Sequence, residues 1–216
     1  NPTNGEYHQR LGLILSELGE YETADTALRS GIAHDSINPA RYRRYALWLF
    51  AMGQREAGLE MMRKTISLEP QATRDDITLM ILSGLGDDEI ERAMPECAEP
   101  QIIFARYLRK TGNDSMAEEA YRRALRYLPK EEHKNTSYFH EVYNFYMKKE
   151  RHEAALSIME RAKYYFPKDA GVRTAAGSAY EKIGMRDKAI DEYRAALAID
   201  SKEKNAKKRL EILLSE

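Results

Sequence analysis

Two short stretches begin like a zinc-binding helix. "HEVYN" (residues 140–144) and "HEAAL" (residues 152–156) each start with the histidine and glutamate of the H-E-x-x-H pattern. In that pattern two histidines on one helical face hold the metal. Asn144 and Leu156 occupy the position of the second histidine. Because a single histidine cannot hold zinc, the sequence predicts ordinary helix residues here and no metal site.

No other stretch has the residues of a catalytic or nucleotide-binding motif. "GLGDDE" (residues 84–89) lacks the third glycine and the lysine of a phosphate-binding loop, and its aspartates would repel a phosphate. No serine stands between the glycines of a nucleophile elbow, and Cys97 lies among acidic residues that disfavour the reactive thiolate. Acidic pairs are frequent, as on any solvated helix face. The sequence therefore predicts a non-catalytic protein with no cofactor.

The composition indicates a folded chain with a well-solvated surface. Of 216 residues, 43% are hydrophobic and 32% charged, and 34 Lys+Arg against 35 Asp+Glu give a net charge of -1. Because the charges balance, the chain as a whole has no excess of positive charge that would attract nucleic acid. No apolar stretch is long enough to span a membrane. With one cysteine, the chain cannot form an internal disulfide. Asn1 is not an initiator methionine and no signal-peptide pattern follows it, so we expect a piece of a longer protein.

A repeated pattern runs through almost the whole chain. "LGLILSELGEYETADTALRSGI", "YALWLFAMGQREAGLEMMRKTI" and "FARYLRKTGNDSMAEEAYRRAL" each place a glycine eight residues after a large residue and a small residue five further on. Glycine at this place indicates a left-handed residue that ends a helix. The intervals between successive markers include 34, 38 and 34 residues, and the markers are Gly19, Gly53, Gly112, Glu150 (in place of a glycine) and Gly184.

Apolar stripes with a helical period lie on both sides of each marker. Small and large residues recur at i, i+1 and i+4 before it, and at i, i+4 and i+7 after it, as in Ala24, Leu28 and Gly31. The small residue lets two helix backbones approach, and the large one fills the adjoining space. Prolines just past the second segments stop them, at Pro70, Pro129 and Pro167.

Residues 72–97 depart from this pattern. Their sequence predicts a helix, a glycine-rich turn and a short acidic helix. Asp87 or Asp88 can cap the start of the short helix, and Pro95 ends it. Pro100 then falls at the start of the next helix, where proline is tolerated. We interpret the stretch as a shortened repeat, and not as a linker or an active-site loop.

Repeats of 34 residues with this signature resemble the tetratricopeptide repeat family, in which each repeat is a pair of antiparallel helices. The resemblance implies an all-α tetratricopeptide solenoid, a right-handed superhelix of helix-turn-helix repeats with one shortened central repeat. "KEKNAKKRLEILLSE" has an amphipathic pattern that predicts a C-terminal capping helix. We expect a single array over 1–216, with repeats at about 5–38, 39–71, 72–97 (shortened), 98–131, 136–169 and 170–201 and the cap at 202–216.

The resemblance also implies a concave groove, lined by the first helices, that binds a peptide or a partner's helix. Arginine suits bidentate recognition of carboxylates, so we expect a protein or peptide partner of acidic or C-terminal character. The alternative is that these positions are merely solvated. The expected peptide-binding residues are Arg43, Leu47, Phe50, Ile102, Arg106, Arg109, Lys110, His140, Asn144, Met147 and Lys148, and the stripe continues through Thr174, Ser178, Glu181 and Lys182.

A narrower resemblance rests on the order of parts. "NPTNGEYHQRLGLIL", then a full repeat, then the short "ILSGLGDDEIERAMPE", then "AEEAYRRAL" is similar to the soluble C-terminal repeat region of bacterial membrane proteins of the O-antigen ligase and polymerase group. That resemblance implies a scaffold for cell-surface polysaccharide assembly at the periplasmic face of the inner membrane. The alternatives are a soluble cytoplasmic adaptor and a carbohydrate-binding module, the latter suggested by 14 tyrosines.

Overall fold

The computed structural model describes residues 4–131 and 134–215, and every regular element in these ranges is a helix. The first half contains α1 (Gly5–Glu17), α2 (Tyr21–Ala33), α3 (Pro39–Ala51), α4 (Arg55–Leu68), η1 (Pro70–Ala72), α5 (Thr73–Leu82), α6 (Asp87–Ala93), α7 (Ala98–Thr111) and α8 (Asp114–Tyr127). The remainder contains η2 (Leu128–Lys130), α9 (Thr136–Lys148), α10 (His152–Tyr165), α11 (Ala170–Lys182), α12 (Arg186–Ile199) and α13 (Lys204–Ser215).

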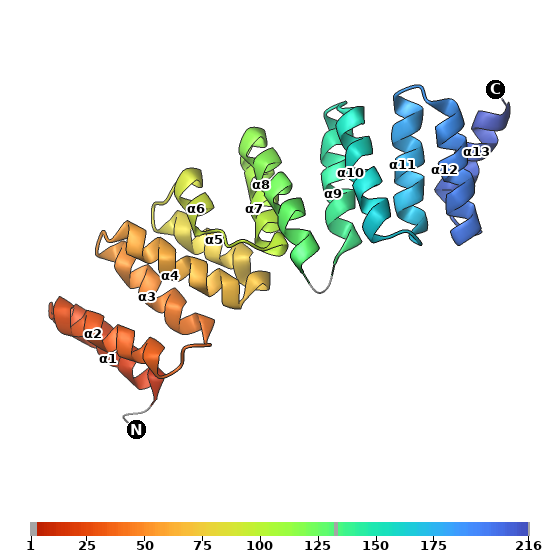
Figure 1. Cartoon of the computed structure of the whole chain (residues 1–216). Helices are drawn as coiled ribbons and strands as arrows, with labels where there is room; N and C mark the ends of the chain where they lie inside the picture. The colour runs from red at the N-terminus through yellow and green to blue at the C-terminus, as the bar shows by residue number, and fades with distance from the viewer. Residues whose placement is uncertain (1–3, 132–133, 216) are drawn as a thin grey trace. The chain divides into compact units, whose positions relative to one another are not determined.

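The chain divides into two compact units, the first ending at Leu128 and the second beginning at Pro129. In unit 1, consecutive helices pack as pairs, α1 with α2, α3 with α4 and α7 with α8; in unit 2, α9 pairs with α10 and α11 with α12 (Figure 1). The predicted all-α solenoid of helix-turn-helix repeats is confirmed. One array over 1–216, with the repeat bounds given above, stays a prediction.

The turn between the two helices of a pair needs a left-handed residue. Gly19, Gly53, Gly112 and Gly184 have φ of 81°, 75°, 84° and 79°, as the marker pattern predicted. This geometry lets the next amide reach back over the helix end: Glu20 N–H donates to the Leu15 carbonyl at 2.9 Å. Glu150 occupies the same place with φ 57°, and among the described residues it is the one non-glycine with positive φ.

Replacing Glu150 with glycine is expected to stabilise the protein. A left-handed conformation costs a non-glycine residue about 1–2 kcal/mol, while glycine loses about 0.5–1 kcal/mol more chain entropy on folding. The expected gain in the free energy of unfolding is therefore about 0.5–1 kcal/mol, measured by urea denaturation. Gly112→Glu is the reciprocal control and should lower the free energy of unfolding. Because no atom lies within 4 Å of a Cβ added at Gly112, that loss would come from the backbone conformation and not from a steric clash. A loss of stability in Glu150→Gly would contradict this account of the turn.

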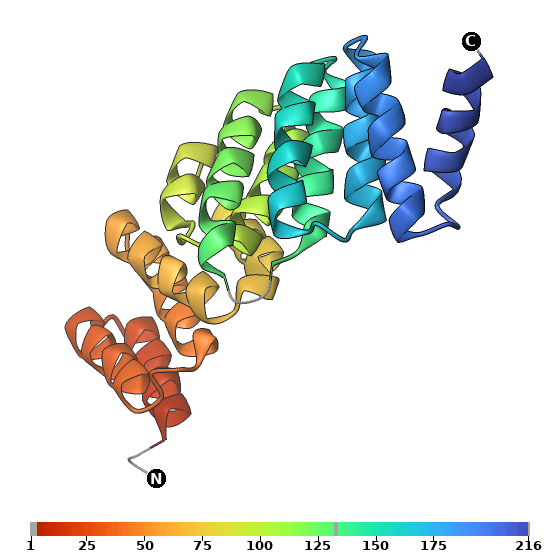
Figure 2. The same ribbon diagram turned by 45° about the vertical axis from the view of Figure 1, so that its right-hand side comes forward.

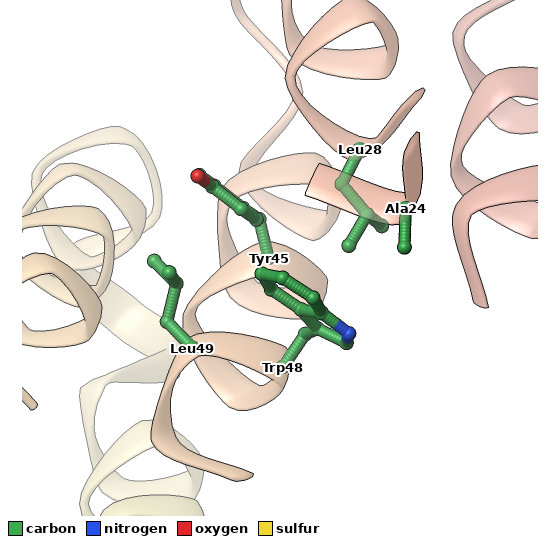
Figure 3. Packing of buried hydrophobic residues seen from close by; sticks show 5 residues of the cluster. All are labelled: Ala24, Leu28, Tyr45, Trp48 and Leu49. Atoms are coloured by element: carbon green, nitrogen blue, oxygen red, sulfur yellow. The ribbon is translucent and has the colours of Figure 1, made fainter. Parts of the chain in front are cut away.

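The core consists of side chains from neighbouring pairs that interlock. In unit 1, Tyr45, Trp48 and Leu49 of α3 pack against Ala24 and Leu28 of α2, and all five are buried (Figure 3). Small residues permit this close approach: a Cβ on Gly12 of α1 would lie 2.7 Å from Leu28 Cγ and 3.0 Å from the Ala24 carbonyl oxygen. The alternation of small and large residues in the sequence thus corresponds to backbone contact between helices.

The stretch predicted to be a shortened repeat contains α5 and α6, of 10 and 7 residues, which pack on α7 and α4 respectively. Gly86, and not Asp87 or Asp88, is the N-cap of α6, and its N–H donates to the Glu89 side chain at 3.1 Å. The prediction of an aspartate cap was therefore wrong. Asp87 instead accepts hydrogen bonds from Tyr107 (2.9 Å) and from Asn113 (3.2 Å).

Helix α13 covers the end of unit 2. Its Ala206 and Leu213 are buried in the same cluster as Ala189 and Tyr193 of α12, and Figure 2 shows α13 beside α12. Arg209 of α13 donates to Glu181 of α11 at 3.0 Å. Of the apolar stripe predicted for the cap, Ala206 and Leu213 are buried and Leu210 is partly buried, whereas Leu214 is 58% exposed. Residue 216 of the predicted cap lies outside the described residues.

Candidate functional site

A pocket of about 250 Å³ lies between α5 and α7 in unit 1. Each helix contributes four residues at i, i+3, i+4 and i+7, so one continuous face of each helix lines it. The lining residues are Arg74, Ile77, Thr78 and Ile81 from α5, and Ile103, Arg106, Tyr107 and Lys110 from α7.

Three cations surround the apolar part of this pocket. Arg74 and Lys110 are exposed and Arg106 is half-buried, whereas Ile77 has 2% of its surface exposed and Ile81 has 41%. Among the described residues, none that lines the pocket is acidic. The arrangement offers a ligand an apolar floor together with positive charge at the rim, which suits an apolar side chain flanked by carboxylates.

Tyr107 is held in place by the neighbouring short helix. Its hydroxyl donates to Asp87 Oδ1 at 2.9 Å, and burial, together with that hydrogen bond, raises the pKa of Tyr107 to about 12. The hydroxyl therefore stays protonated at neutral pH, and its proton is directed to α6 and away from a ligand. The ring supplies a fixed apolar wall to the pocket.

Arg43 was predicted to bind a ligand, but it is engaged within unit 1. Its Nε donates to Asp76 at 2.6 Å, and an Nη donates to Glu69 at 2.9 Å. Asp76 has no exposed surface, and burial raises the pKa of its carboxyl while Arg43 opposes that rise. Arg43 thus links α3 to α5 and to Glu69, which directly precedes η1, and its predicted role in binding stays a prediction.

Three other predicted groove residues of unit 1 face neighbouring helices. Ile102 is fully buried, because α7 packs against α5 and η1 as well as α8. Phe50 has 9% of its surface exposed and lies over Gly58 of α4, where an added Cβ would be 2.4 Å from the ring. Arg109 donates to the Tyr121 hydroxyl at 3.2 Å. Ile102 and Phe50 are thus buried in this structure, and their role in binding stays a prediction. Leu47 is half-buried outside the pocket.

Unit 2 has a separate and more polar pocket of about 540 Å³. Its lining includes three predicted residues, His140, Thr174 and Ser178. The other predicted residues of α9, Asn144, Met147 and Lys148, do not line it. Asn144 and Lys148 are exposed. Glu181, predicted to extend the stripe, is bound by Arg209 of α13. The lining is His140, Tyr143, Gly171, Thr174, Ala175, Ser178, Tyr193, Glu203, Asn205, Lys208 and Arg209.

The sequence analysis did not predict the residues of α5 that line the unit 1 pocket. The shortened repeat was treated as an irregularity, so no binding position was assigned to it. Its signal was nevertheless present, because Arg74, Ile77, Thr78 and Ile81 have the same spacing as Ile103, Arg106, Tyr107 and Lys110. Of the lining residues, only Arg106 and Lys110 had been predicted.

Two segments of the sequence match a protein-family model described as tetratricopeptide repeat, at residues 5–33 and 170–203. The first contains α1 and α2, and the second contains α11 and α12. These two helix pairs are tetratricopeptide repeats. A tetratricopeptide array of this kind is a scaffold for protein–protein interaction. The narrower resemblance to O-antigen ligase-like proteins, and the compartment, stay predictions.

Several solved structures are similar to this chain at low sequence identity. YrrB, described as a TPR protein with an unusual peptide-binding site, is 17% identical, with a TM-score of 0.50 over 85% of this chain and 97% of YrrB. MamA is 18% identical, with a TM-score of 0.43 over 92% of this chain and 93% of MamA. The Cut9–Hcn1 structure is 15% identical, with a TM-score of 0.48 over 99% of this chain and 44% of the matched chain. No curated protein matches the sequence.

Within residues 4–131 and 134–215, no three His, Cys, Asp or Glu side chains are grouped as metal ligands. In the same ranges no helix has the length and apolar character needed to cross a bilayer.

Proposed function

We propose that this tetratricopeptide scaffold binds an acidic peptide segment of a partner protein in the α5–α7 pocket of unit 1. The observation that supports the proposal is the placement of Arg74, Arg106 and Lys110 around the isoleucines of both helices. The proposed ligand is an extended or helical segment with at least one branched apolar side chain, flanked by carboxylates of acidic side chains or of the chain terminus. No bond is made or broken in this function.

The two parts of the pocket contribute differently to binding. An ion pair at an exposed site stabilises a complex by about 0.2–1 kcal/mol, so the cations alone give weak binding. Burying a leucine-sized side chain contributes about 1.5–3 kcal/mol. Affinity therefore requires the apolar anchor, while the cations select against basic or neutral segments. Attraction to the cations weakens as salt rises, because the screening length falls to about 8 Å at physiological ionic strength.

The test uses a fluorescein-labelled peptide with two central leucines and two glutamates on each side, measured by anisotropy against the whole chain. Arg74→Glu/Arg106→Glu is expected to weaken binding by about tenfold or more, since loss of attraction and added repulsion together exceed about 1.4 kcal/mol. The affinity for unchanged protein is expected to fall between 50 mM and 500 mM salt.

Lys64→Glu/Arg126→Glu is the matched control, because it makes the same change in net charge at exposed positions of α4 and α8. It should leave the affinity within about twofold. Equal weakening in both variants would show that only net charge matters. Equal binding of a peptide with lysines in place of the glutamates would exclude an acidic ligand for this pocket.

A further inference from the structure

A second pocket of unit 1, of about 580 Å³, lies between α2 and the turn that joins α3 to α4. One wall is a face of α2 that includes Tyr21 and Glu22 of its first turn. The other wall comes from the end of α3, with Trp48 and the C-cap Met52, and from Gln54, the N-cap of α4. Both walls therefore belong to successive helix pairs of unit 1.

The apolar part of this pocket is aromatic and is held in place. Trp48 donates through Nε1 to Ser16 Oγ at 2.8 Å and stacks on Tyr45, with ring centroids 6.0 Å apart (Figure 3). Trp48 is 6% exposed and Met52 is half-buried, whereas the Tyr21 side chain is 53% exposed. A fixed apolar floor with an exposed aromatic ring suits a side chain that has an aliphatic stem and a cationic head.

The polar part of the pocket carries a negative charge that is not neutralised. Asp25 and Arg29, which also line it, are paired at 2.7 Å, so their charges cancel. The Glu22 carboxylate is exposed, and among the described residues none donates to it or pairs with it. Residues 11–28 include four acidic residues and no lysine or arginine, which adds to the negative potential. The pocket therefore favours a cation.

The next helix pair shows which cation a carboxylate at this position binds. Glu56 lies 34 residues after Glu22, in the first turn of α4, and accepts a hydrogen bond from Arg92 of α6 at 2.7 Å. There the chain supplies the guanidinium itself, because α6 packs on α4. Arginine also fits the aromatic wall better than lysine, since its planar guanidinium can stack on the Tyr21 ring while its N–H groups donate to a carboxylate.

We propose that this pocket binds an arginine side chain of a partner protein. The guanidinium lies on the Tyr21 ring and donates to Glu22, and the methylene groups lie against Trp48. The arginine is part of a chain, because Arg29, the one cation among the described lining residues, is already bound by its own helix and leaves no partner for a free α-carboxylate. The pocket shares no residue with the α5–α7 pocket, so the proposal is independent of the proposed function.

The probe is N-acetylarginine amide, and the reporter is Trp48, the single tryptophan of the chain. Its fluorescence and its indole N–H resonance are expected to change saturably, with a millimolar dissociation constant because only one side chain is bound. At equal ionic strength, the neutral N-acetylcitrulline amide should bind about fivefold more weakly, and N-acetyllysine amide about twofold or more. Free L-arginine should also bind about twofold or more weakly, since its α-carboxylate meets acidic surroundings.

Glu22→Gln is expected to weaken binding of N-acetylarginine amide about threefold to fivefold, and Tyr21→Leu about twofold to fivefold. The matched control is Glu153→Gln, the same change in the first turn of α10 in unit 2, which should leave the affinity within about twofold. Circular dichroism establishes that all three variants are folded.

Three results overturn the proposal: no saturable change in either Trp48 signal, equal binding of the citrulline amide, or equal weakening by Glu22→Gln and Glu153→Gln. Equal binding of the lysine amide overturns the choice of arginine. Tighter binding of free L-arginine than of its blocked amide also overturns the proposal, because the occupant is then a free amino acid and not a partner protein.

Discussion

Replacing Arg43 with methionine is expected to lower the free energy of unfolding by about 3–5 kcal/mol at pH 7, the usual cost of removing one partner from a buried ion pair. Asp76 has no exposed surface, and the Arg43 side chain is 22% exposed. Methionine retains most of the aliphatic contact of arginine but leaves the Asp76 carboxylate without its positive partner. Urea denaturation followed by circular dichroism measures the loss.

The pH dependence of the same variant follows from the pKa of Asp76. Burial raises this pKa from its ordinary value of 3.8, and loss of Arg43 removes the cation that opposes the rise. A carboxyl with a raised folded-state pKa contributes stability below its unfolded pKa and loses it as pH rises through the folded value. The deficit of Arg43→Met should therefore be small near pH 4 and grow toward pH 7.

A second substitution separates charge from packing in this variant. Asp76→Asn added to Arg43→Met removes the unpaired charge at nearly constant volume, so the double variant should recover at least half of the loss at pH 7 and show little dependence on pH. If the double variant is as unstable as Arg43→Met at both pH values, the loss comes from packing and the ion pair does not hold η1 and α5 in place.

Gly12→Leu is expected to destabilise the protein by about 3 kcal/mol, at the upper end of what overpacking a core costs. Even the first added carbon would lie 2.7 Å from Leu28 Cγ and 3.0 Å from the Ala24 carbonyl oxygen, and that backbone oxygen cannot move without moving α2. Gly12→Ala separates the steric effect from helix propensity. Propensity alone predicts a gain of about 1 kcal/mol, whereas the contact predicts a loss.

The control for Gly12→Leu is a leucine added to the exposed side of the same helix pair. Thr23 of α2 is exposed, so Thr23→Leu should change the free energy of unfolding by no more than about 0.5 kcal/mol. Comparable losses at both positions would mean that the α1–α2 pair does not depend on backbone approach at Gly12. A stabilising Gly12→Ala would lead to the same conclusion.

The helix pairs could be predicted because their signals are local. A glycine at the helix end, a proline after the second helix and a small residue at the contact each act within one pair. Even Glu150 could be placed in a left-handed turn, since its neighbours repeat the pattern around Gly112 and Gly184. The N-cap of α6 was assigned wrongly, because several residues near it were acceptable caps and only the backbone conformation distinguishes them.

The binding positions could not be predicted to the same extent, because they depend on which helix lies next to which. The repeat register puts Arg43, Ile102 and His140 at equivalent positions, yet Arg43 is ion-paired, Ile102 is fully buried and His140 lines a pocket. The difference arises from the neighbours: α3 contacts α5 with its buried aspartate, and α7 contacts both α5 and η1. A single repeat contains no information about these contacts.

The short helix α6 makes the middle of unit 1 prone to local opening. It has 7 residues, too few for a helix to be stable on its own, and its buried anchors are Ile90 and Ala93. Much of its remaining attachment is polar, through Glu89 to Arg55 at 2.7 Å and Asp87 to Tyr107 at 2.9 Å. The ion pair is exposed and is screened by salt. Opening of α6 would release the Tyr107 hydroxyl, so the order of this helix and the shape of the α5–α7 pocket are thermodynamically linked. A ligand that requires the fixed ring would therefore lower the population of the open state.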